Sequence, residues 1–212
     1  KYKAPLHLRG LWKQFIDAID LPAIQRIALT TPATFDAALD RMPEGTDRMM
    51  YAATRTTLSP NIAHAGVKVN VIPDSAEVDI DIRTLAGDDG DGVRQMLRDA
   101  AGDLWDDIEV VHEGSNPATS SPANTPLWDA LTKVTQRLIP GSTTVPFLVV
   151  GATDARFFRR KGVVSYGYGL MSERIPFGQF SRMFHGNDER VDQETLGLMT
   201  PLWEGAVREM LG

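Results

Sequence analysis

The sequence has 212 residues, of which 42% are hydrophobic and 24% are charged, and its formal net charge is −6. This apolar content supports a buried core and excludes a disordered chain, while the acidic balance argues against a nucleic-acid partner. No apolar run approaches the roughly 18 residues of a membrane span, so no membrane partner is expected. Cysteine is absent, which excludes disulfides and thiolate metal sites and favours a reducing, cytoplasmic location.

The first half of the chain predicts helices around a small antiparallel sheet. Hydrophobic residues recur at spacings of three and four in residues 7–20, which predicts an amphipathic helix. Residues 21–47 are interrupted by prolines and predict short helical turns at best. Residues 49–59 predict a weakly patterned strand. Another amphipathic helix is expected to begin near Val93, and a short strand is expected over residues 107–114.

The clearest local pattern lies between residues 66 and 83. Valines alternate with polar residues from 67 to 71, and a second alternating run covers residues 76–83. A polar turn at residues 73–75 separates the two runs. Two runs of period two joined by a tight turn predict a β-hairpin with one face in the core.

These elements predict two domains. Residues 1–114 predict a small antiparallel-sheet α+β domain, a split βαββαβ unit whose first strand is missing. Residues 115–124 are rich in Ser, Pro and Asn and predict a hinge. Helices and strands then alternate over residues 125–212, which predicts an α/β domain with parallel strands and functional loops at their carboxyl ends. The expected strands are 144–151 and 163–169, and the expected helices are 125–139, 153–162 and 192–211 with a kink at Pro201.

His185 is the most conspicuous candidate for chemistry. It lies in "FHGNDERV", between an apolar run and a helical pattern, with Asp188 and Glu189 close behind it. A histidine beside carboxylates is typical of metal and acid–base sites, but spacing alone leaves a ligand and a packing residue equally open. The rest of the chain offers no H-x-D or H-E-x-x-H segment, so a self-sufficient metal site is not expected. The other three histidines, His7, His64 and His112, are interpreted as surface or packing residues.

Asn70 and Arg83 form a second candidate pair. They lie on adjacent strands of the predicted hairpin, where the tight turn brings them near each other. Arginine offers a planar fork for a carboxylate and asparagine an amide donor. The alternative is that Arg83 only caps an exposed strand end. The basic segment 156–162 is interpreted as a solvated face at a helix end.

Three stretches in this order resemble one enzyme family. They are "GVKVNVIPDSAEVDIDIRTLAG", "PFLVVGATDARFFRRKGVVSYGYG" and "FHGNDERV" followed by a helix. They resemble the dinuclear-zinc amidohydrolases and metallopeptidases that include aminoacylase, acetylornithine deacetylase, succinyl-diaminopimelate desuccinylase and glutamate carboxypeptidase. The resemblance covers most of the chain from about residue 55 onward.

The resemblance implies a role for each domain and for six residues. Residues 1–114 would be the lid and dimerisation domain, and residues 115–212 the carboxyl-terminal portion of an α/β zinc-peptidase catalytic domain. His185 matches the last zinc ligand of the family. Ala152 departs from the commoner Gly or Thr of the pocket loop. The substrate-binding positions that the resemblance implies are Asn70, Arg83, Gly151, Thr153 and Arg156.

The resemblance also implies an activity that needs further residues. The family's other zinc ligands and its general-base glutamate precede the lid and have no match here, so no catalytic residue is predicted in this chain. The expected function is that of an incomplete hydrolase, inactive alone, from an enzyme that cleaves N-acyl amino acids or small peptides. Two zinc ions, a substrate with a free carboxylate and a homodimer through the lid are implied. The alternative is a non-catalytic dimerisation or carboxylate-binding module.

Overall fold

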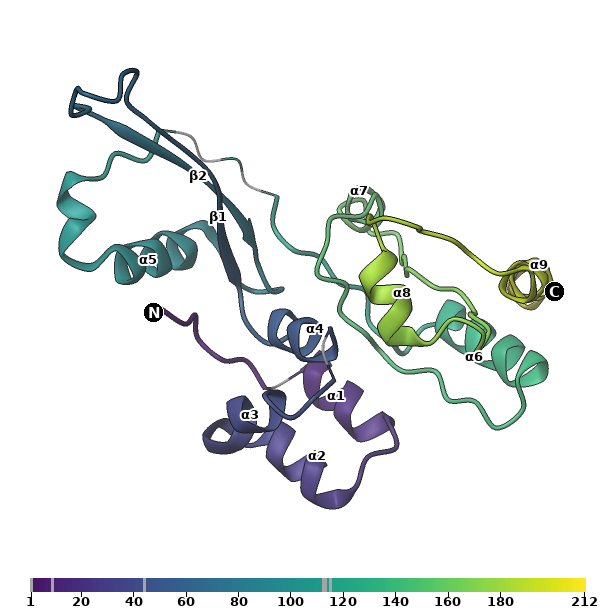
Figure 1. The fold of residues 1–212 in the computed structure, drawn as a ribbon. Coiled ribbons are helices and arrows are strands. Elements are labelled where there is room, and N and C mark those ends of the chain that lie inside the picture. Colours follow the sequence, from purple (N-terminus) through teal and green to yellow (C-terminus); the bar gives the residue numbers. More distant parts are fainter. Residues whose placement is uncertain (1, 9, 44, 112–113, 115) are drawn as a thin grey trace. The chain divides into compact units, whose positions relative to one another are not determined.

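The computed structural model describes residues 2–8, 10–43, 45–111, 114 and 116–212, and it forms two compact units. The first unit contains residues 1–7 and 52–118, and the second contains residues 8–51 and 119–212. This division differs from the predicted domains, because the helices of residues 8–51 pack in the second unit. The elements are α1 (Leu11–Ala18), α2 (Ala23–Thr30), α3 (Pro32–Leu39), α4 (Thr46–Ala52), β1 (Thr57–Ala65), β2 (Ala76–Arg83), α5 (Gly90–Ala101), the 3-10 helix η1 (Gly102–Asp107), α6 (Pro126–Leu138), α7 (Ala155–Arg159), α8 (Phe177–Met183) and α9 (Gln193–Leu211) (Figure 1).

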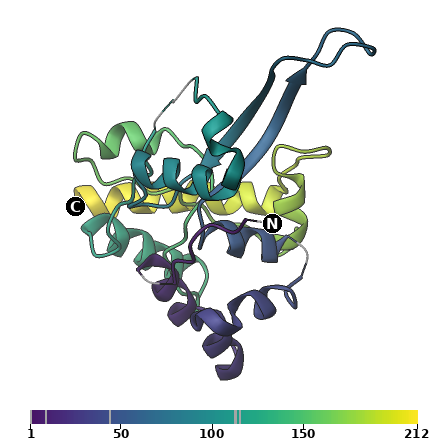
Figure 2. The ribbon, with the colours of Figure 1, turned by 90° about the vertical axis from the view of Figure 1, so that its left-hand side faces the viewer.

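The fold is α+β with a small antiparallel sheet. Within the described part of the chain, ladder pairing is confined to β1 and β2, which align Thr57 with Arg83 and Ala65 with Ala76. A bulge at Asn61 interrupts the register next to Pro60, which has no N–H for the ladder. Figure 2 shows the two strands as a long twisted ribbon with their connection at its end.

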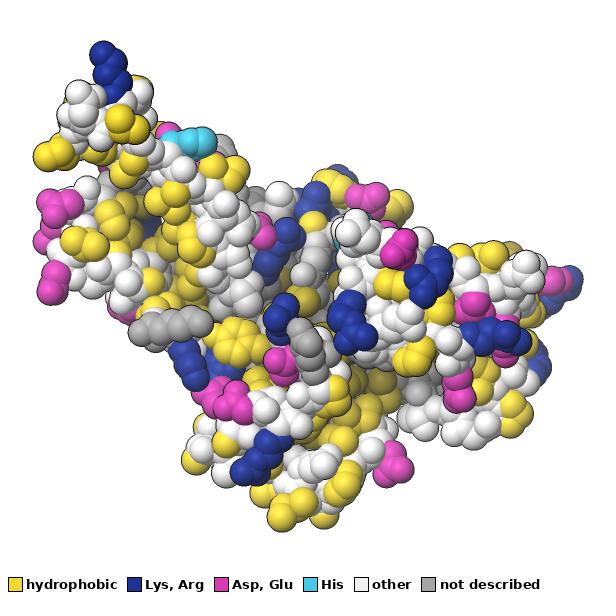
Figure 3. All heavy atoms as spheres, in the orientation of Figure 1, with side chains coloured by type: hydrophobic (Ala, Val, Ile, Leu, Met, Phe, Trp, Pro, Cys, Tyr) yellow, Lys and Arg dark blue, Asp and Glu magenta, His cyan; other side chains and the backbone are white. Residues whose placement is uncertain are grey.

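The predicted hairpin register is wrong. Its first strand is residues 57–65, whereas residues 66–75 form the connection to β2. The valines at 67, 69 and 71 alternate with polar residues, but alternation alone cannot show that a ladder partner is present. Both faces of the hairpin are largely exposed, so the expected burial of one face is also wrong. Hydrophobic side chains accordingly lie on its surface, at the upper left of Figure 3.

The proline-rich region of residues 21–47 is more helical than predicted. Pro22 precedes the first residue of α2, and Pro32 is the first residue of α3. Proline favours helix starts because its fixed φ suits the first turn and its missing N–H has no intrahelical acceptor there. The prolines therefore begin these helices.

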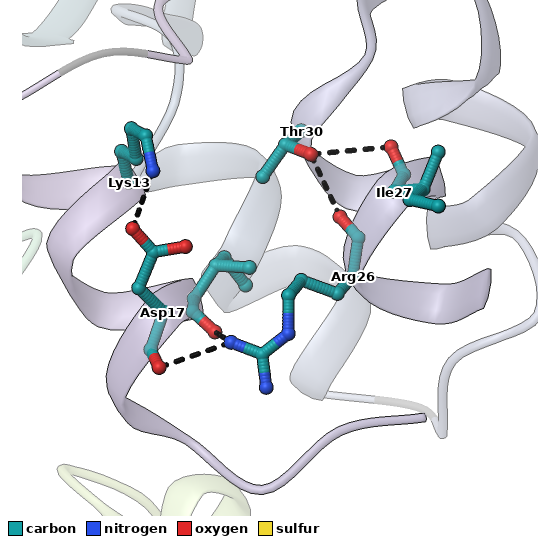
Figure 4. Close-up of polar contacts among 6 residues, drawn as sticks. Lys13, Asp17, Arg26, Ile27 and Thr30 are labelled. Atoms are coloured by element: carbon teal, nitrogen blue, oxygen red, sulfur yellow. Dashed lines mark hydrogen bonds and ion pairs between the residues drawn. The ribbon is translucent and has the colours of Figure 1, made fainter. Parts of the chain in front are cut away.

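Helices α1, α2 and α3 share a small core in the second unit. Trp12 Nε1 donates a hydrogen bond to Leu29 O at 2.8 Å, and its ring meets Phe35 edge-on. The Arg26 guanidinium donates to Ile16 O at 2.8 Å and Asp17 O at 3.0 Å, satisfying carbonyls at the end of α1 (Figure 4). Thr30 Oγ1 donates a hydrogen bond to Arg26 O at 2.8 Å, close to the end of α2.

Helices α6 and α9 form the larger core of the second unit. Thr125 caps α6 by accepting a hydrogen bond from Trp128 N, and Pro126 is its first residue, as predicted. Helix α9 contains Pro201 within its span. The core between them consists of Leu131, Val134, Leu170, Leu202 and Ala206.

The predicted strands of the second half are not found. Residues 144–151 and 163–169 lie outside any helix or ladder, and so do residues 108–111, while residues 112 and 113 lie outside the described part. Tyr166 and Tyr168 instead reach α6 through their hydroxyls, which bond Thr125 at 2.6 Å and Thr135 at 2.7 Å. None of the described helices has the length and apolar character of a membrane span.

Candidate functional site

His185 lies in a tight loop after α8. Phe184 N still donates to Phe180 O, after which His185 adopts a φ of 57° and Asp188 a φ of 58°. The left-handed region is uncommon for residues other than glycine and carries a strain of order 1 kcal/mol. The loop is held by His185 N, which donates to Glu189 Oε2 at 3.3 Å, and by Gly186 N, which donates to Met183 O at 2.7 Å. This strained backbone marks His185 as a candidate functional position.

The imidazole of His185 is exposed and packs edge-on against Phe184, with ring centroids 4.3 Å apart. An open cavity of about 320 Å³ adjoins the loop. Most of its lining residues are apolar, and the charged ones contribute one carboxylate and one guanidinium. The lining residues are Phe180, Met183, Phe184, Glu189, Arg190 and Val191.

The described residues do not assemble a metal centre. Among them, no three His, Cys, Asp or Glu side chains approach closely enough to hold one ion. Zinc sites use three or four protein ligands, so a single imidazole does not fit a two-zinc centre by itself. Within this part of the chain, His185 could supply one ligand of a larger set.

The segment from Gly151 to Arg156 contains a candidate carboxylate-binding group, the guanidinium of Arg156. Gly151 and Thr153 are exposed, and Arg156 N donates to Thr153 O at the start of α7. The Nε of Arg156 is buried without a hydrogen-bond partner, and the guanidinium carbon lies 4.8 Å from the centre of the Phe157 ring. An unsatisfied buried guanidinium N–H costs free energy, which an incoming carboxylate would recover.

Asn70 and Arg83 are not neighbours, which corrects the sequence expectation. Asn70 lies in the connection after β1, and Arg83 is the last residue of β2 at the opposite end of the hairpin. The seven steps from Ala76 to Arg83 span roughly 23 Å at ~3.3 Å per residue. Arg83 Nε instead donates to Asp81 Oδ2 at 2.7 Å, two residues away on the same face of β2.

Four of the six predicted site residues lie in the second unit, and Asn70 and Arg83 lie in the first. Gly151, Thr153 and Arg156 lie within six residues of one another, in the loop before α7 and in the first turn of that helix. Within the described part, no hydrogen bond or ion pair connects that loop with His185.

Arg159 was missed by sequence reasoning, which assigned residues 156–162 to a solvated face. It is half-buried and makes five hydrogen bonds to described residues, with acceptors on Thr119, Ser121 and Ser165. The three acceptor positions lie 38 to 40 residues before it or six residues after it. No local sequence pattern reports contacts of that kind.

Asp192 is the most strongly perturbed acid near the His185 loop. Hydrogen bonds from Thr195, first from its backbone N–H, lower the pKa of Asp192 to about 2, against opposition from desolvation. Ser172 contributes a further bond. Hydrogen bonds to a carboxylate favour its charged form, and this position is the N-cap of α9. The perturbation therefore has a structural cause.

Comparison with known proteins identifies the fold family. Residues 27–109 match the family model of the M20 peptidase dimerisation domain. The match begins in α2 and includes the hairpin, α5 and η1. This stretch of the chain is therefore similar to an M20 peptidase dimerisation domain. The M20 assignment agrees with the resemblance carried by the three sequence stretches.

Two curated relatives match the chain over about two thirds of its length. It is 28% identical over 144 residues to the human N-fatty-acyl-amino acid synthase/hydrolase PM20D1, covering 66% of this chain and 28% of that protein. It is 27% identical over 151 residues to a succinyl-diaminopimelate desuccinylase of Helicobacter pylori, covering 69% of this chain and 35% of that protein. The chain thus spans about a third of the length of these relatives. No solved structure matches it at comparable significance.

Proposed function

We propose that this M20 chain supplies the dimerisation lid and part of the substrate site of a metal-dependent hydrolase that cleaves N-acyl amino acids or small peptides. The observation that carries the proposal is the dimerisation-domain match over residues 27–109. One relative is named for hydrolysis of N-fatty-acyl amino acids and another for removal of a succinyl group from diaminopimelate. Both names describe an acyl group on an amino acid.

The lid assignment is supported by the exposed hairpin. The side chains of Val67, Val69 and Ile72 are almost completely exposed in the connection between the strands. Exposed apolar groups and unpaired strand edges are typical of surfaces that another chain covers. In the proposal a second copy of this chain covers them, as a symmetric homodimer.

Each unit offers one arginine as a candidate group for binding a substrate carboxylate. Arg83 is exposed at the end of β2, and its bond to Asp81 engages only Nε. Arg156 has a buried Nε without a hydrogen-bond partner beside the Gly151 and Thr153 loop. A guanidinium binds a carboxylate through two parallel hydrogen bonds. Asn70 lies at the opposite end of the hairpin from Arg83, so its amide would bind a different group from the one that Arg83 binds.

His185 would supply one metal ligand in the complete enzyme. M20 enzymes are generally metal-dependent, and the neutral imidazole can donate one lone pair to zinc. The described residues offer no complete set, so the proposal places the other ligands and the general base outside these 212 residues. Bound zinc would activate water for attack on the amide carbonyl.

One experiment tests this division of roles. The purified chain is dialysed against zinc and then against metal-free buffer, and bound zinc and hydrolysis of N-acetyl amino acids are measured. We expect well under one zinc per chain and no hydrolysis, because one histidine does not hold zinc against water. A full equivalent of zinc that disappears in His185→Ala would show a complete site within the chain. Robust zinc-dependent hydrolysis would contradict the proposed incompleteness.

A non-catalytic dimerisation or carboxylate-binding module is the second candidate, favoured by the missing metal cluster in the described residues. The two candidates differ in whether the chain needs further metal ligands from another segment. Adding the catalytic segment of an M20 relative in trans or by fusion should restore zinc binding that depends on His185 if the chain is a hydrolase part. A chain that dimerises and binds N-acetyl amino acids, but never gains His185-dependent zinc, would be the module.

A further inference from the structure

We propose that Arg159 is a positioning residue that fixes α7 and thereby sets the place of the Arg156 guanidinium. This inference rests on the proposed carboxylate-binding role of Arg156. The two arginines lie three residues apart on the same five-residue helix, and the C-cap residue Arg160 donates its N–H to Arg156 O. Residues three apart lie on neighbouring positions of a helix face.

Among the described residues, the side chains of helix α7 are little buried. It contains no fully buried side chain, Phe157 and Phe158 are more than half exposed, and its N-cap residue Asp154 makes no side-chain cap bond. A helix this short is not stable by itself, because helix nucleation is costly and isolated helices need roughly 12–15 residues. Its position must therefore come from contacts outside the helix.

Arg159 provides such contacts in two directions. Its Nε and Nη2 donate to Ser165 O at 3.0 and 2.6 Å, which joins α7 to the segment that follows it. Its Nε also donates to Ser121 Oγ at 3.2 Å, and its Nη1 to Thr119 O at 3.2 Å. The guanidinium thus connects α7 with the segment where the chain enters the second unit.

Two further bonds make this a closed network. Ser165 N donates to Ser121 Oγ at 3.1 Å, so the two partners of Arg159 also hold each other. The hydroxyl of Tyr166 donates to Pro122 O at 2.5 Å. Removing the Arg159 side chain would leave residues 119–122 bonded to residues 165–166 but would remove the side-chain bonds that join α7 to both. The predicted effect is therefore centred on α7 and Arg156.

Lysine cannot replace Arg159 fully. An ammonium is a compact point charge on a flexible stem, whereas the planar guanidinium presents several donors in fixed directions. Arg159→Lys should keep a bond to Ser165 O but lose the simultaneous bonds to residues 119 and 121. Lys161→Ala is the matched control, since it removes a cation two residues away with an exposed side chain.

Hydrogen exchange of the full 212-residue chain tests the anchoring without any ligand. We expect amides of residues 157–163 to exchange about tenfold faster in Arg159→Ala, because bonds to a charged group are lost. Arg159→Lys should fall between it and wild type, and Lys161→Ala should match wild type. If Arg159→Ala does not fold, the comparison of Arg159→Lys with Lys161→Ala decides. Unchanged exchange in these Arg159 variants would overturn the proposal.

The arginine Nε–H resonances in ¹⁵N spectra test whether Arg159 places the Arg156 guanidinium or only stabilises α7. The Arg156 resonance should move in Arg159→Ala, move less in Arg159→Lys, and stay in place in Lys161→Ala. An unmoved Arg156 resonance beside faster exchange would show that Arg159 is only structural, which would overturn the proposal.

Titration with N-acetyl-L-alanine separates this inference from the proposed function. In wild type the probe should shift the Arg156 resonance, and its Kd should rise about tenfold in Arg159→Ala because Arg156 is displaced. If the Arg156 resonance of the wild-type chain does not shift when the probe is added, the carboxylate-binding role is contradicted. The exchange and resonance results would still decide the position of α7.

Discussion

The contact between α6 and α9 and the hairpin β1–β2 use similar apolar residues in opposite ways. In the helix pair, Leu131, Val134 and Leu202 are buried almost completely. In the hairpin and its connection, Val67 and Val69 are almost fully exposed. Hydrophobic burial stabilises by about 25 cal/mol per Å² removed from water, so only the first region contributes this energy within one chain. The hairpin and its connection can contribute this free energy when another chain covers them.

This contrast makes the helix pair sensitive to substitution and the hairpin tolerant of it in a monomer. The largest expected effect is at Leu202, which has no exposed surface and lies on α9 facing α6. Leu202→Ala should lower the free energy of unfolding by about 2–5 kcal/mol, from lost burial and the cavity left behind. Urea unfolding measures it. Val207→Ala on the exposed side of α9 is the control and should change stability by less than about 0.5 kcal/mol. Equal losses of unfolding free energy in Leu202→Ala and Val207→Ala would contradict the contrast between buried and exposed apolar residues.

A tight contact between α6 and α9 at Gly205 gives the next effect. A Cβ at Gly205 would lie 2.9 Å from Val134 Cγ1 and 2.9 Å from Arg137 Nη2. Because Val134 is completely buried, Gly205→Ala should destabilise by about 1–3 kcal/mol despite the better helix propensity of alanine.

Gly197→Ala is the matched control on the same helix. A Cβ there meets no atom within 4 Å, so this substitution should stabilise by up to about 1 kcal/mol. Thermal unfolding of both variants gives the comparison. Stabilisation by Gly205→Ala would show that the helices can separate freely at this position.

The cap of α9 adds a smaller, pH-dependent effect. The pKa of Asp192 falls from 3.8 to about 2 on folding, so its contribution is present above pH 4 and is lost as the pH falls from about 4 to 2. At pH 7, Asp192→Ala should lower Tm by roughly 2–4 °C through loss of the cap. Asp192→Asn should keep most of the stability at pH 7, because its oxygen still accepts, and lose the extra acid dependence. A wild-type slope between pH 4 and 2 in Asp192→Asn would assign the titration to another group.

The smallest effect is expected in the hairpin connection. Val69→Ser should change the stability of a monomer by less than about 0.5 kcal/mol, because the side chain is already in water. Chemical unfolding at low micromolar concentration measures this. A loss comparable to that of Leu202→Ala would mean that Val69 is buried in the folded monomer.

The sequence predicted those elements whose signals are local. Helix α6 was predicted with its Thr125 cap and Pro126 start, and α9 with its bounds nearly correct. The hairpin register was not, because the alternation over residues 67–71 does not reveal whether a partner strand lies beside it. Residues 144–151 are apolar like a buried strand, yet ladder formation depends on distant segments.

The candidate site shows the same limit. His185 was expected at a strand-to-helix connection, but it lies between the two helices α8 and α9. Its left-handed backbone belongs to that short loop. Arg159 depends on acceptors about 40 residues earlier in the chain, which composition and periodicity do not report. The roles of His185, Arg83 and Arg156 in catalysis or binding remain predictions.

The mass of the protein in solution tests most directly whether the hairpin is an interface. Sedimentation equilibrium from low to high micromolar concentration should show twice the 23.3 kDa of one chain at the upper end. Val69→Ser should shift this equilibrium toward the monomer without changing the monomer's stability. A mass of 23.3 kDa at every concentration would contradict the account. A dimer with the same dissociation constant in Val69→Ser as in wild type would also contradict it.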